Sequence, residues 1–375
     1  MPVGARAQSK PPANPAAKPT AKPPAPRPPT ASLPLQPLKE ARTQFIAFDA
    51  SAFPYRGVIP DSNRPFLDAQ AGPRRGHTTS RGDVFWEDTT YSDRRSLLFL
   101  PQGFNPQLPA LIILYLHGNG ATLERDVRDR QSVVRQLADS GQNAALVAPQ
   151  LAVDAGDSSA GNFWRPGHFA KYLDEAAERL MRLFGDRRAG AVFNAAPVII
   201  VAYSGGYLPA VYSLARGGAE HRVRGVMLMD ALYSDEPKVA AWLAARWRTA
   251  FLLSAFTEST RGENATLKHL LAARRISYSE GLPATLVPGT VAFVATGGLE
   301  MHGDFMTRAW GPDPLRQALT MIPGYPRVPP PPPPKPAPKP LAKPLAKPVA
   351  KPAAKPAAKP STVRAKSSPP KRRVP

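Results

Sequence analysis

The fold of this chain is decided by residues 198–215, which read VIIVAYSGGYLPAVYSLA. The β-branched apolar run from Val198 to Val201 predicts a buried strand, and the segment that resumes at Tyr207 predicts a helix. Between the two, Ser204 stands at the apex of a sharp turn made of small residues. Such a turn holds a serine hydroxyl above the sheet edge, at a helix N-terminus that favours developing negative charge.

Three other apolar runs of buried-strand type also end in polar residues suited to catalysis. Residues 110–116 lead into His117-Gly-Asn-Gly120, residues 223–229 lead into Asp230, and residues 290–296 lead into a glycine-containing loop with His302. Strands that alternate with helices predict an α/β, doubly wound, mostly parallel sheet whose ligand site lies at the carboxyl ends of its strands. All of these polar residues stand at such ends.

The turn at Ser204 is similar to the nucleophile elbow G-x-S-x-G, with Ala202 in the place of the first glycine. With the order Ser, Asp, His and an HG loop upstream, roughly residues 83–322 resemble the α/β-hydrolase superfamily. The resemblance implies a serine hydrolase of the esterase, lipase or peptidase kind, which acts on a small-molecule or acyl substrate and needs no cofactor. It does not indicate which substrate.

The resemblance implies a role for each marked residue. Ser204 would attack the acyl carbon, His302 would act as base, and Asp230 would orient the imidazole. Glu258 is an alternative acid, because it follows the next apolar run (residues 251–256) and many relatives place the acid there. His168, in a loop that could line the pocket, is the reserve base.

Two further groups of residues are expected around the serine. Backbone N–H groups of Gly205 and of Gly118 or Asn119 would form the oxyanion hole. Tyr203, Asn162 and Trp164 are candidates for the substrate pocket, although Trp164 is equally well explained as a packed loop aromatic. No metal-ligand or phosphate-loop motif is present in the sequence.

The positive charge is concentrated at the two ends of the chain. The net charge is +21; residues 1–44 hold seven Lys or Arg and one Glu, and residues 327–375 hold thirteen and no acid. The sequence therefore predicts a near-neutral catalytic domain over residues 45–326 between two proline-rich segments that are disordered by composition.

The C-terminal segment is a low-complexity repeat with a lysine every four residues from Lys335 to Lys359. One interpretation is a semi-stiff spacer. The other is sequence-independent contact with a polyanion: cell-wall polymer, membrane surface or nucleic acid. We expect no membrane span, because no run of 18 apolar residues occurs. The absence of cysteine leaves the compartment open between cytoplasm and cell envelope, and Ala5-Arg6-Ala7 has the small-x-small form of a cleavage site.

A coarse reading of the remaining sequence gives further expectations. Residues 84–86, 96–100 and 144–149 read as strands, residues 122–139 as a crossover helix and 169–184 as a second helix, whereas residues 45–82 read as irregular. A function of another class also remains open: an inactive hydrolase fold that serves as a binding module, anchored to a polyanion by the basic segments.

Overall fold

The computed structural model describes Gly4 and residues 34–327. The Lys-Pro repeat and most of the N-terminal segment lie outside these residues, and so do the expectations placed on them. Residues 34–44 are part of the described structure: Leu38 is buried, and the first strand begins at Arg42.

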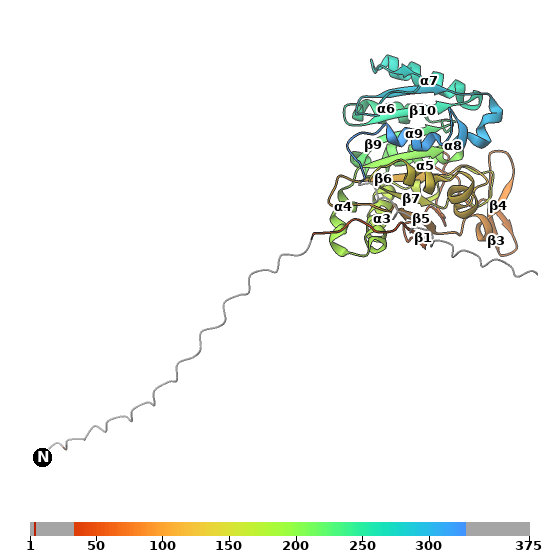
Figure 1. The fold of residues 1–375 in the computed structure, drawn as a ribbon. Coiled ribbons are helices and arrows are strands. Elements are labelled where there is room, and N and C mark those ends of the chain that lie inside the picture. The colour runs from red at the N-terminus through yellow and green to blue at the C-terminus, as the bar shows by residue number, and fades with distance from the viewer. Residues whose placement is uncertain (1–3, 5–33, 328–375) are drawn as a thin grey trace, which may run out of the picture. The chain divides into compact units, whose positions relative to one another are not determined.

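The framework is a nine-stranded mixed sheet, drawn as a stack of arrows in Figure 1. Only β5 runs against its neighbours, so all other adjacent pairs are parallel. In spatial order its strands are β1 (Arg42–Ala47), β5 (Arg95–Leu100), β7 (Ala144–Pro149), β6 (Leu111–Leu116), β8 (Val198–Tyr203), β9 (Val223–Met229), β10 (Phe251–Phe256), β12 (Val291–Ala295) and β11 (Ser279–Glu280). The apolar runs read from the sequence as strands are therefore confirmed.

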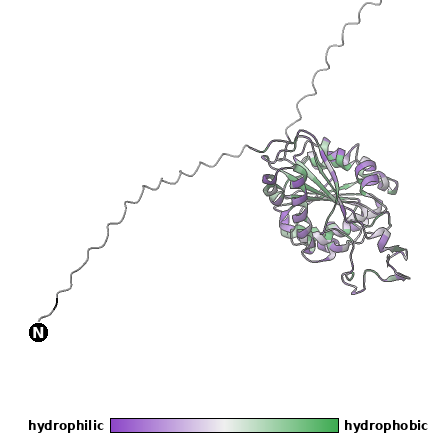
Figure 2. Cartoon of the chain, turned by 90° about the horizontal axis from the view of Figure 1, so that it is seen from below, coloured by the Kyte–Doolittle hydropathy of each residue, from purple (hydrophilic) through white to green (hydrophobic). Residues whose placement is uncertain are grey.

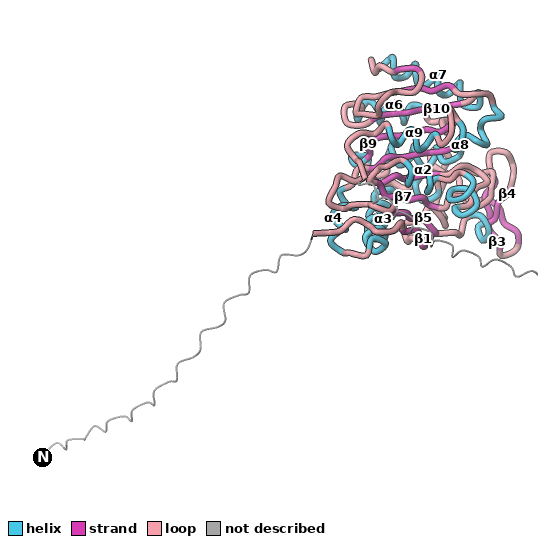
Figure 3. The backbone as a smooth tube through the Cα atoms, viewed as in Figure 1, coloured by secondary structure: helices cyan, strands magenta, loops and turns pink. Residues whose placement is uncertain are grey.

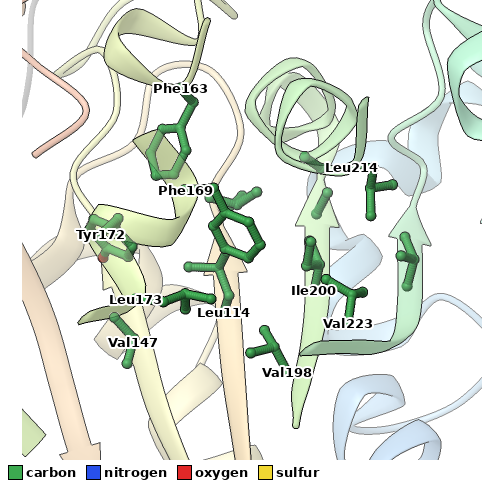
Figure 4. Packing of buried hydrophobic residues seen from close by; sticks show 14 of the residues in the cluster. Leu114, Val147, Phe163, Phe169, Tyr172, Leu173, Val198, Ile200, Leu214 and Val223 are labelled. Carbon is green, nitrogen blue, oxygen red and sulfur yellow. The ribbon is translucent and has the colours of Figure 1, made fainter. Parts of the chain in front are cut away.

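Both faces of the sheet are covered by helices (Figure 3), which is why β7, β6 and β8 are buried at every position. Alternate residues of β8 enter two separate cores: Ile200 packs on one side and Val201 on the other. On the first side, Ile200 and Leu114 face Phe169 and Leu214 (Figure 4). In Figure 2 the strands inside the molecule are mostly hydrophobic, and hydrophilic residues lie on the outer faces of the helices.

The helices fall into two layers. The layer on the Ile200 side contains α3 (His168–Phe184), α4 (Gly190–Ala195), α5 (Tyr207–Arg216), α6 (Glu236–Arg246) and α7 (Arg261–Ala273). The layer on the Val201 side contains a π-helix (Leu123–Arg130), α2 (Val133–Asp139), α8 (Phe305–Arg308) and α9 (Pro314–Thr320). The short α1 (Glu87–Thr90) precedes β5. The expected helix over residues 169–184 is confirmed as α3.

The expectation of one continuous helix over residues 122–139 is wrong. The segment divides at Gln131 and Ser132 into the π-helix and α2. The Tyr115 hydroxyl donates a 2.6 Å hydrogen bond to Gln131 Oε1, and Ser132 has a φ of +50°. A left-handed residue ends a helix, and nothing in the apolar spacing announces it.

The expectation that residues 45–82 are irregular is also wrong. They contribute the second half of β1 and the strands β2 (Ala69–Ala71) and β3 (Arg74–Thr78), which form a small antiparallel sheet with the following β4 (Val84–Trp86). Gly72 and Pro73 form the two-residue turn between β2 and β3, with Gly72 at a φ of +56°. Because proline fixes a negative φ at the second position, the turn belongs to the II′ class that suits hairpins.

Candidate active site

The carboxyl ends of the parallel strands bring together the serine, histidine and aspartate singled out in the sequence. Ser204 Oγ lies 2.9 Å from His302 Nε2, and His302 Nδ1 lies 2.6 Å from Asp230 Oδ2. Since a carboxylate only accepts, Nδ1 carries the proton and Nε2 is left to accept the proton of Ser204. These contacts are consistent with a Ser-His-Asp triad.

The backbone at Ser204 has the geometry that its sequence predicts. Its φ is +50°, in the left-handed region, and it joins β8 directly to a 3₁₀ turn (Ser204–Gly206) and α5. Non-glycine residues rarely adopt this conformation, and such strain is concentrated at functional sites. Ala202, in the place of the first elbow glycine, is fully buried within β8.

Asp230 sits in a closed cage of hydrogen-bond donors. Besides His302, its carboxylate accepts from the Thr257 N–H at 3.0 Å, the Thr257 hydroxyl at 2.7 Å, the Ser259 hydroxyl at 2.9 Å and the Thr260 hydroxyl at 2.7 Å. Burial raises the pKa of Asp230, but the hydrogen bonds from His302, Thr257 and Thr260 outweigh it and lower the pKa to about 2. The carboxylate therefore stays ionised at neutral pH although it is fully buried.

The two alternatives left open by the sequence are placed elsewhere. Glu258 pairs with Arg261, and about half of each side chain is exposed (52%/52%). The pKa of the Glu258 carboxyl is lowered by its hydrogen bond with Arg261. The reserve base, His168, places Nε2 3.0 Å from the carbonyl of Ala50, and no contact joins it to Ser204 within residues 34–327. His302 is the histidine that contacts Ser204, and Asp230 is the carboxylate that contacts His302.

His117 anchors the loop that follows β6. Its Nε2 accepts the Leu151 N–H at 2.9 Å, and its Nδ1 lies 2.8 Å from the carbonyl of Gly118. Burial lowers the pKa of His117 to about 4, against the opposing hydrogen bond to Gly118. The ring is therefore neutral at pH 7, and it ties this loop to the end of β7.

Gly118, Asn119 and Gly205 lie together beside Ser204. A Cβ on Gly118 would come within 2.7 Å of Ser204 Cβ, and a Cβ on Gly205 would collide with Asn119 Oδ1. That same oxygen accepts the Ser158 hydroxyl at 3.1 Å, which fixes the Asn119 side chain. Within residues 34–327, no protein acceptor takes the Asn119 backbone N–H. This free N–H and its place beside Ser204 are what an oxyanion hole requires.

The three residues proposed for the substrate pocket differ in position. Tyr203 packs on the His302 ring, with centroids 5.5 Å apart, and its hydroxyl donates to the His302 carbonyl at 2.7 Å. Asn162 donates to the carbonyls of Ser51 and Pro54. Trp164 packs edge-on against two buried rings, Tyr55 and Phe66. Among the described contacts, only Tyr203 reaches the triad.

Sequence reasoning missed four residues at this site: Thr257, Ser259, Thr260 and Tyr233. The first three belong to the run Thr257-Glu-Ser-Thr260, directly after β10, which also contains the alternative acid Glu258. A hydroxyl-rich run at a strand end beside the acid was the available signal. Tyr233 follows Asp230 by three residues, and its ring lies edge-on to His302, with centroids 6.4 Å apart.

The described residues contain neither a cluster of three His, Asp or Glu side chains placed to hold a metal ion nor a helix long and apolar enough to cross a membrane.

Neither a protein-family model nor a curated protein sequence matches this chain. Among solved structures, a feruloyl esterase module from Clostridium thermocellum, complexed with sinapinate, is 14% identical, with 72% of this chain and 95% of that chain covered and a TM-score of 0.39. An S-formylglutathione hydrolase from Agrobacterium tumefaciens is 11% identical, with 68% and 97% covered and a TM-score of 0.36. A dienelactone hydrolase from Anabaena variabilis is 14% identical, with 68% and 87% covered and a TM-score of 0.33.

Identities and TM-scores this low carry no conclusion about substrate. The assignment of fold rests on the molecule itself: a mostly parallel sheet with helices on both faces, and a serine in a left-handed turn between a central strand and a helix. The chain has an α/β fold of the α/β-hydrolase type.

Proposed function

We propose that this chain is a serine hydrolase that cleaves an ester, thioester or amide bond through an acyl-enzyme, with residues 45–326 as its catalytic domain. The observation that carries the proposal is the unbroken hydrogen-bond chain from Ser204 Oγ through His302 to Asp230. Its three residues follow three different strands, and packing of the core alone does not require their side chains to meet.

In the first half-reaction, Ser204 Oγ forms a bond to the acyl carbon as its proton passes to His302 Nε2. The negative charge that develops on the acyl oxygen is stabilised by the N–H groups of Asn119 and Gly205. His302 then gives the proton to the leaving group as its bond to the acyl carbon breaks. In the second half-reaction, water attacks the acyl carbon as one of its protons passes to His302 Nε2. The bond from Ser204 Oγ to the acyl carbon then breaks, His302 returns that proton to Ser204, and the carboxylic acid is released.

Asp230 contributes a fixed negative charge to both half-reactions. Its caged carboxylate holds the His302 Nδ1–H in place and stabilises the imidazolium that forms in each step. Since its pKa is lowered to about 2, it does not compete for the proton that moves between Ser204 and His302.

The proposal is tested by steady-state hydrolysis of 4-nitrophenyl acetate, an acetyl thioester and an anilide. We expect turnover of at least one substrate by the wild type, and a fall in kcat of about 10⁶-fold in Ser204→Ala, as for other serine triads. Equal rates for the folded wild type and folded Ser204→Ala would contradict it.

We also propose that the basic segments outside the described residues hold the enzyme to a polyanion. The proposal is supported by the positive charge of the chain, which is concentrated in these segments and not in the near-neutral catalytic domain. On a sulfated-polysaccharide resin, we expect the full chain to elute at higher salt than a variant with neutral repeats. That variant changes seven lysines to Gln: Lys335, Lys339, Lys343, Lys347, Lys351, Lys355 and Lys359. Elution at the same salt would contradict the proposal.

A further inference from the structure

The histidine of the triad stands on a turn that core packing does not fix. His302 lies in a 3₁₀ turn over Leu299–Asp304, and none of these six residues is buried. Leu299, the first of them, is 63% exposed. A catalytic side chain has to be held to within about 0.5 Å of its productive position. The turn therefore depends on contacts from other parts of the chain.

Tyr203 provides the first of these contacts. Its hydroxyl donates to the His302 carbonyl at 2.7 Å, and its ring lies at 25° to the imidazole, with centroids 5.5 Å apart. Burial raises the pKa of Tyr203 to about 12, although the positive charge of Arg130 opposes the rise. The phenol therefore keeps its proton at neutral pH and stays a donor. Because Tyr203 precedes Ser204, the strand that carries the nucleophile also holds the backbone of the base.

Arg130, the last residue of the π-helix, provides the second contact. Its Nη1 donates to the Gly303 carbonyl at 3.1 Å, and its Nε donates to Asp126 Oδ1 at 2.8 Å. The Asp126 side chain is only 4% exposed, so a buried carboxylate fixes the guanidinium that reaches the turn. The carbonyls of His302 and Gly303, which are neighbours in the chain, are thus both bonded to side chains from other elements.

The break between the π-helix and α2 is tied to the same region. The side-chain amide of Gln136 donates to the Gln131 carbonyl at 2.9 Å and to the Met306 carbonyl at 2.7 Å. Gln131 directly follows Arg130, and Met306 lies in α8, directly after the histidine turn. π-Helical turns are rare and occur mostly at functional sites. Here the π-helix ends at the arginine that bonds to the turn.

We propose that Tyr203 and Arg130 are positioning residues, which fix the backbone of the histidine turn so that His302 keeps its contacts with Ser204 and Asp230. The inference rests on the proposed function. Both hydrogen bonds end on backbone carbonyls and not on the groups that react. Loss of either bond should therefore slow the chemical step without weakening substrate binding, which means a lower kcat at an unchanged KM.

The first test compares Tyr203→Phe with Tyr172→Phe, each of which removes the hydroxyl of a buried tyrosine. The Tyr172 hydroxyl contacts Ser96 Oγ at 2.9 Å, in the core on the other side of the sheet. In steady-state hydrolysis of 4-nitrophenyl acetate, we expect Tyr203→Phe to lower kcat about tenfold and to keep the wild-type KM. Tyr172→Phe should change neither constant.

The second test removes the contact from the π-helix. Arg130→Met keeps much of the aliphatic stem but has no donor, and we expect kcat to fall about tenfold at an unchanged KM. Arg130→Lys, which retains a cationic donor, should recover part of that loss. Arg128→Met is the control on the same π-helix, because the Arg128 guanidinium pairs with Asp129. It should keep the wild-type kcat.

A spectroscopic measurement separates positioning from a purely structural role. In protein with ¹⁵N-labelled histidine, the His302 Nδ1–H that bonds to Asp230 can be followed by NMR. We expect this proton to exchange with water faster in Tyr203→Phe and Arg130→Met than in the wild type. The two control variants should match the wild type, since a change in stability alone would leave the imidazole in place.

The inference is overturned if folded Tyr203→Phe or folded Arg130→Met keeps the wild-type kcat and proton exchange, or if a control variant shows the same losses. A wild type that neither turns over substrate nor reacts with a fluorophosphonate probe would instead remove the proposed function. If Tyr203→Phe does not fold, the Arg130 variants decide alone, because that side chain is half exposed. An unchanged kcat in Arg130→Met would then overturn the inference.

Discussion

Two neighbouring strand ends each carry a carboxylate, and the structure treats them in opposite ways. After β9, Asp230 is fully buried, has a φ of +47° and accepts hydrogen bonds on both oxygens. After β10, Glu258 is half exposed and pairs with the arginine three residues ahead. The loop after β10 nevertheless contributes to the site, since its hydroxyls and one N–H face Asp230.

The difference indicates that a carboxylate can serve as the acid of such a triad where hydrogen-bond donors surround it, and that its position after a strand is not enough. An ionised carboxylate is stable away from water only where donors surround it. Thr257, Ser259 and Thr260 supply those donors. The loop after β9 thus carries the charged group, and the loop after β10 carries the hydrogen-bond donors that replace water around it. Glu258 also lies in the loop after β10, but its partner Arg261 is at the surface, where an ion pair contributes little to stability.

The largest expected effect breaks this contrast directly. Asp230→Asn keeps the shape of the side chain but removes the charge that stabilises the imidazolium, so kcat should fall by about 10⁴-fold. Glu258→Gln should stay within about twofold of the wild type, as expected for an exposed pair. Steady-state hydrolysis measures both, and a larger loss in Glu258→Gln would assign the acid to the other loop.

The second effect extends the contrast from carboxylates to histidines. Buried His117 has a pKa lowered to about 4, so the unfolded chain binds its proton first as pH falls. The stability linked to neutral His117 is thus complete above about pH 6.5 and lost as pH falls through about 4, a change of about 3 kcal/mol. Urea unfolding at pH 7 and pH 4 should show the gap between wild type and His117→Gln shrinking by that amount.

Exposed His221 is the matched control for this measurement, and His221→Gln should follow the wild type at both pH values. A gap between wild type and His117→Gln that stays constant from pH 7 to pH 4 would show that His117 is not held neutral by burial.

The smallest effect sharpens the account of the cage. Thr257→Val removes one hydroxyl donor from Asp230 but keeps the backbone N–H and the side-chain volume, so kcat should fall about tenfold. Thr266→Val is the control, because Thr266 is exposed on α7 and its hydroxyl donates to the Gly262 carbonyl, away from Asp230. Equal kcat values for the two variants, both folded by circular dichroism, would mean that the cage has no part in holding the charge.

Much of this site could be predicted from sequence because its residues follow buried strands. Apolar runs are read easily, and a parallel sheet brings their carboxyl ends to one edge. The serine, the histidine, the preferred aspartate and the glycine loop after β6 were predicted on this basis, and the structure brings them together.

The remaining features depend on the direction of side chains and on the sign of the backbone angle φ. The spacing of apolar residues in the sequence encodes neither. Thr257, Ser259 and Thr260 face Asp230 only because the chain turns into α7 at that point. The break at Ser132 and the hairpin turn at Gly72 depend on local positive φ values, which the spacing of apolar residues does not reveal. Tyr233 was missed because an aromatic residue past a strand end is usually explained by packing.

The central claim is that Ser204 is an activated nucleophile. It is tested most directly by intact-mass and peptide mass spectrometry of the full chain after reaction with a fluorophosphonate probe. The account predicts one adduct, on Ser204, lost in Ser204→Ala and much slower to form in His302→Ala and Asp230→Asn. A folded wild type that forms no adduct, or an adduct that persists in Ser204→Ala, would contradict it.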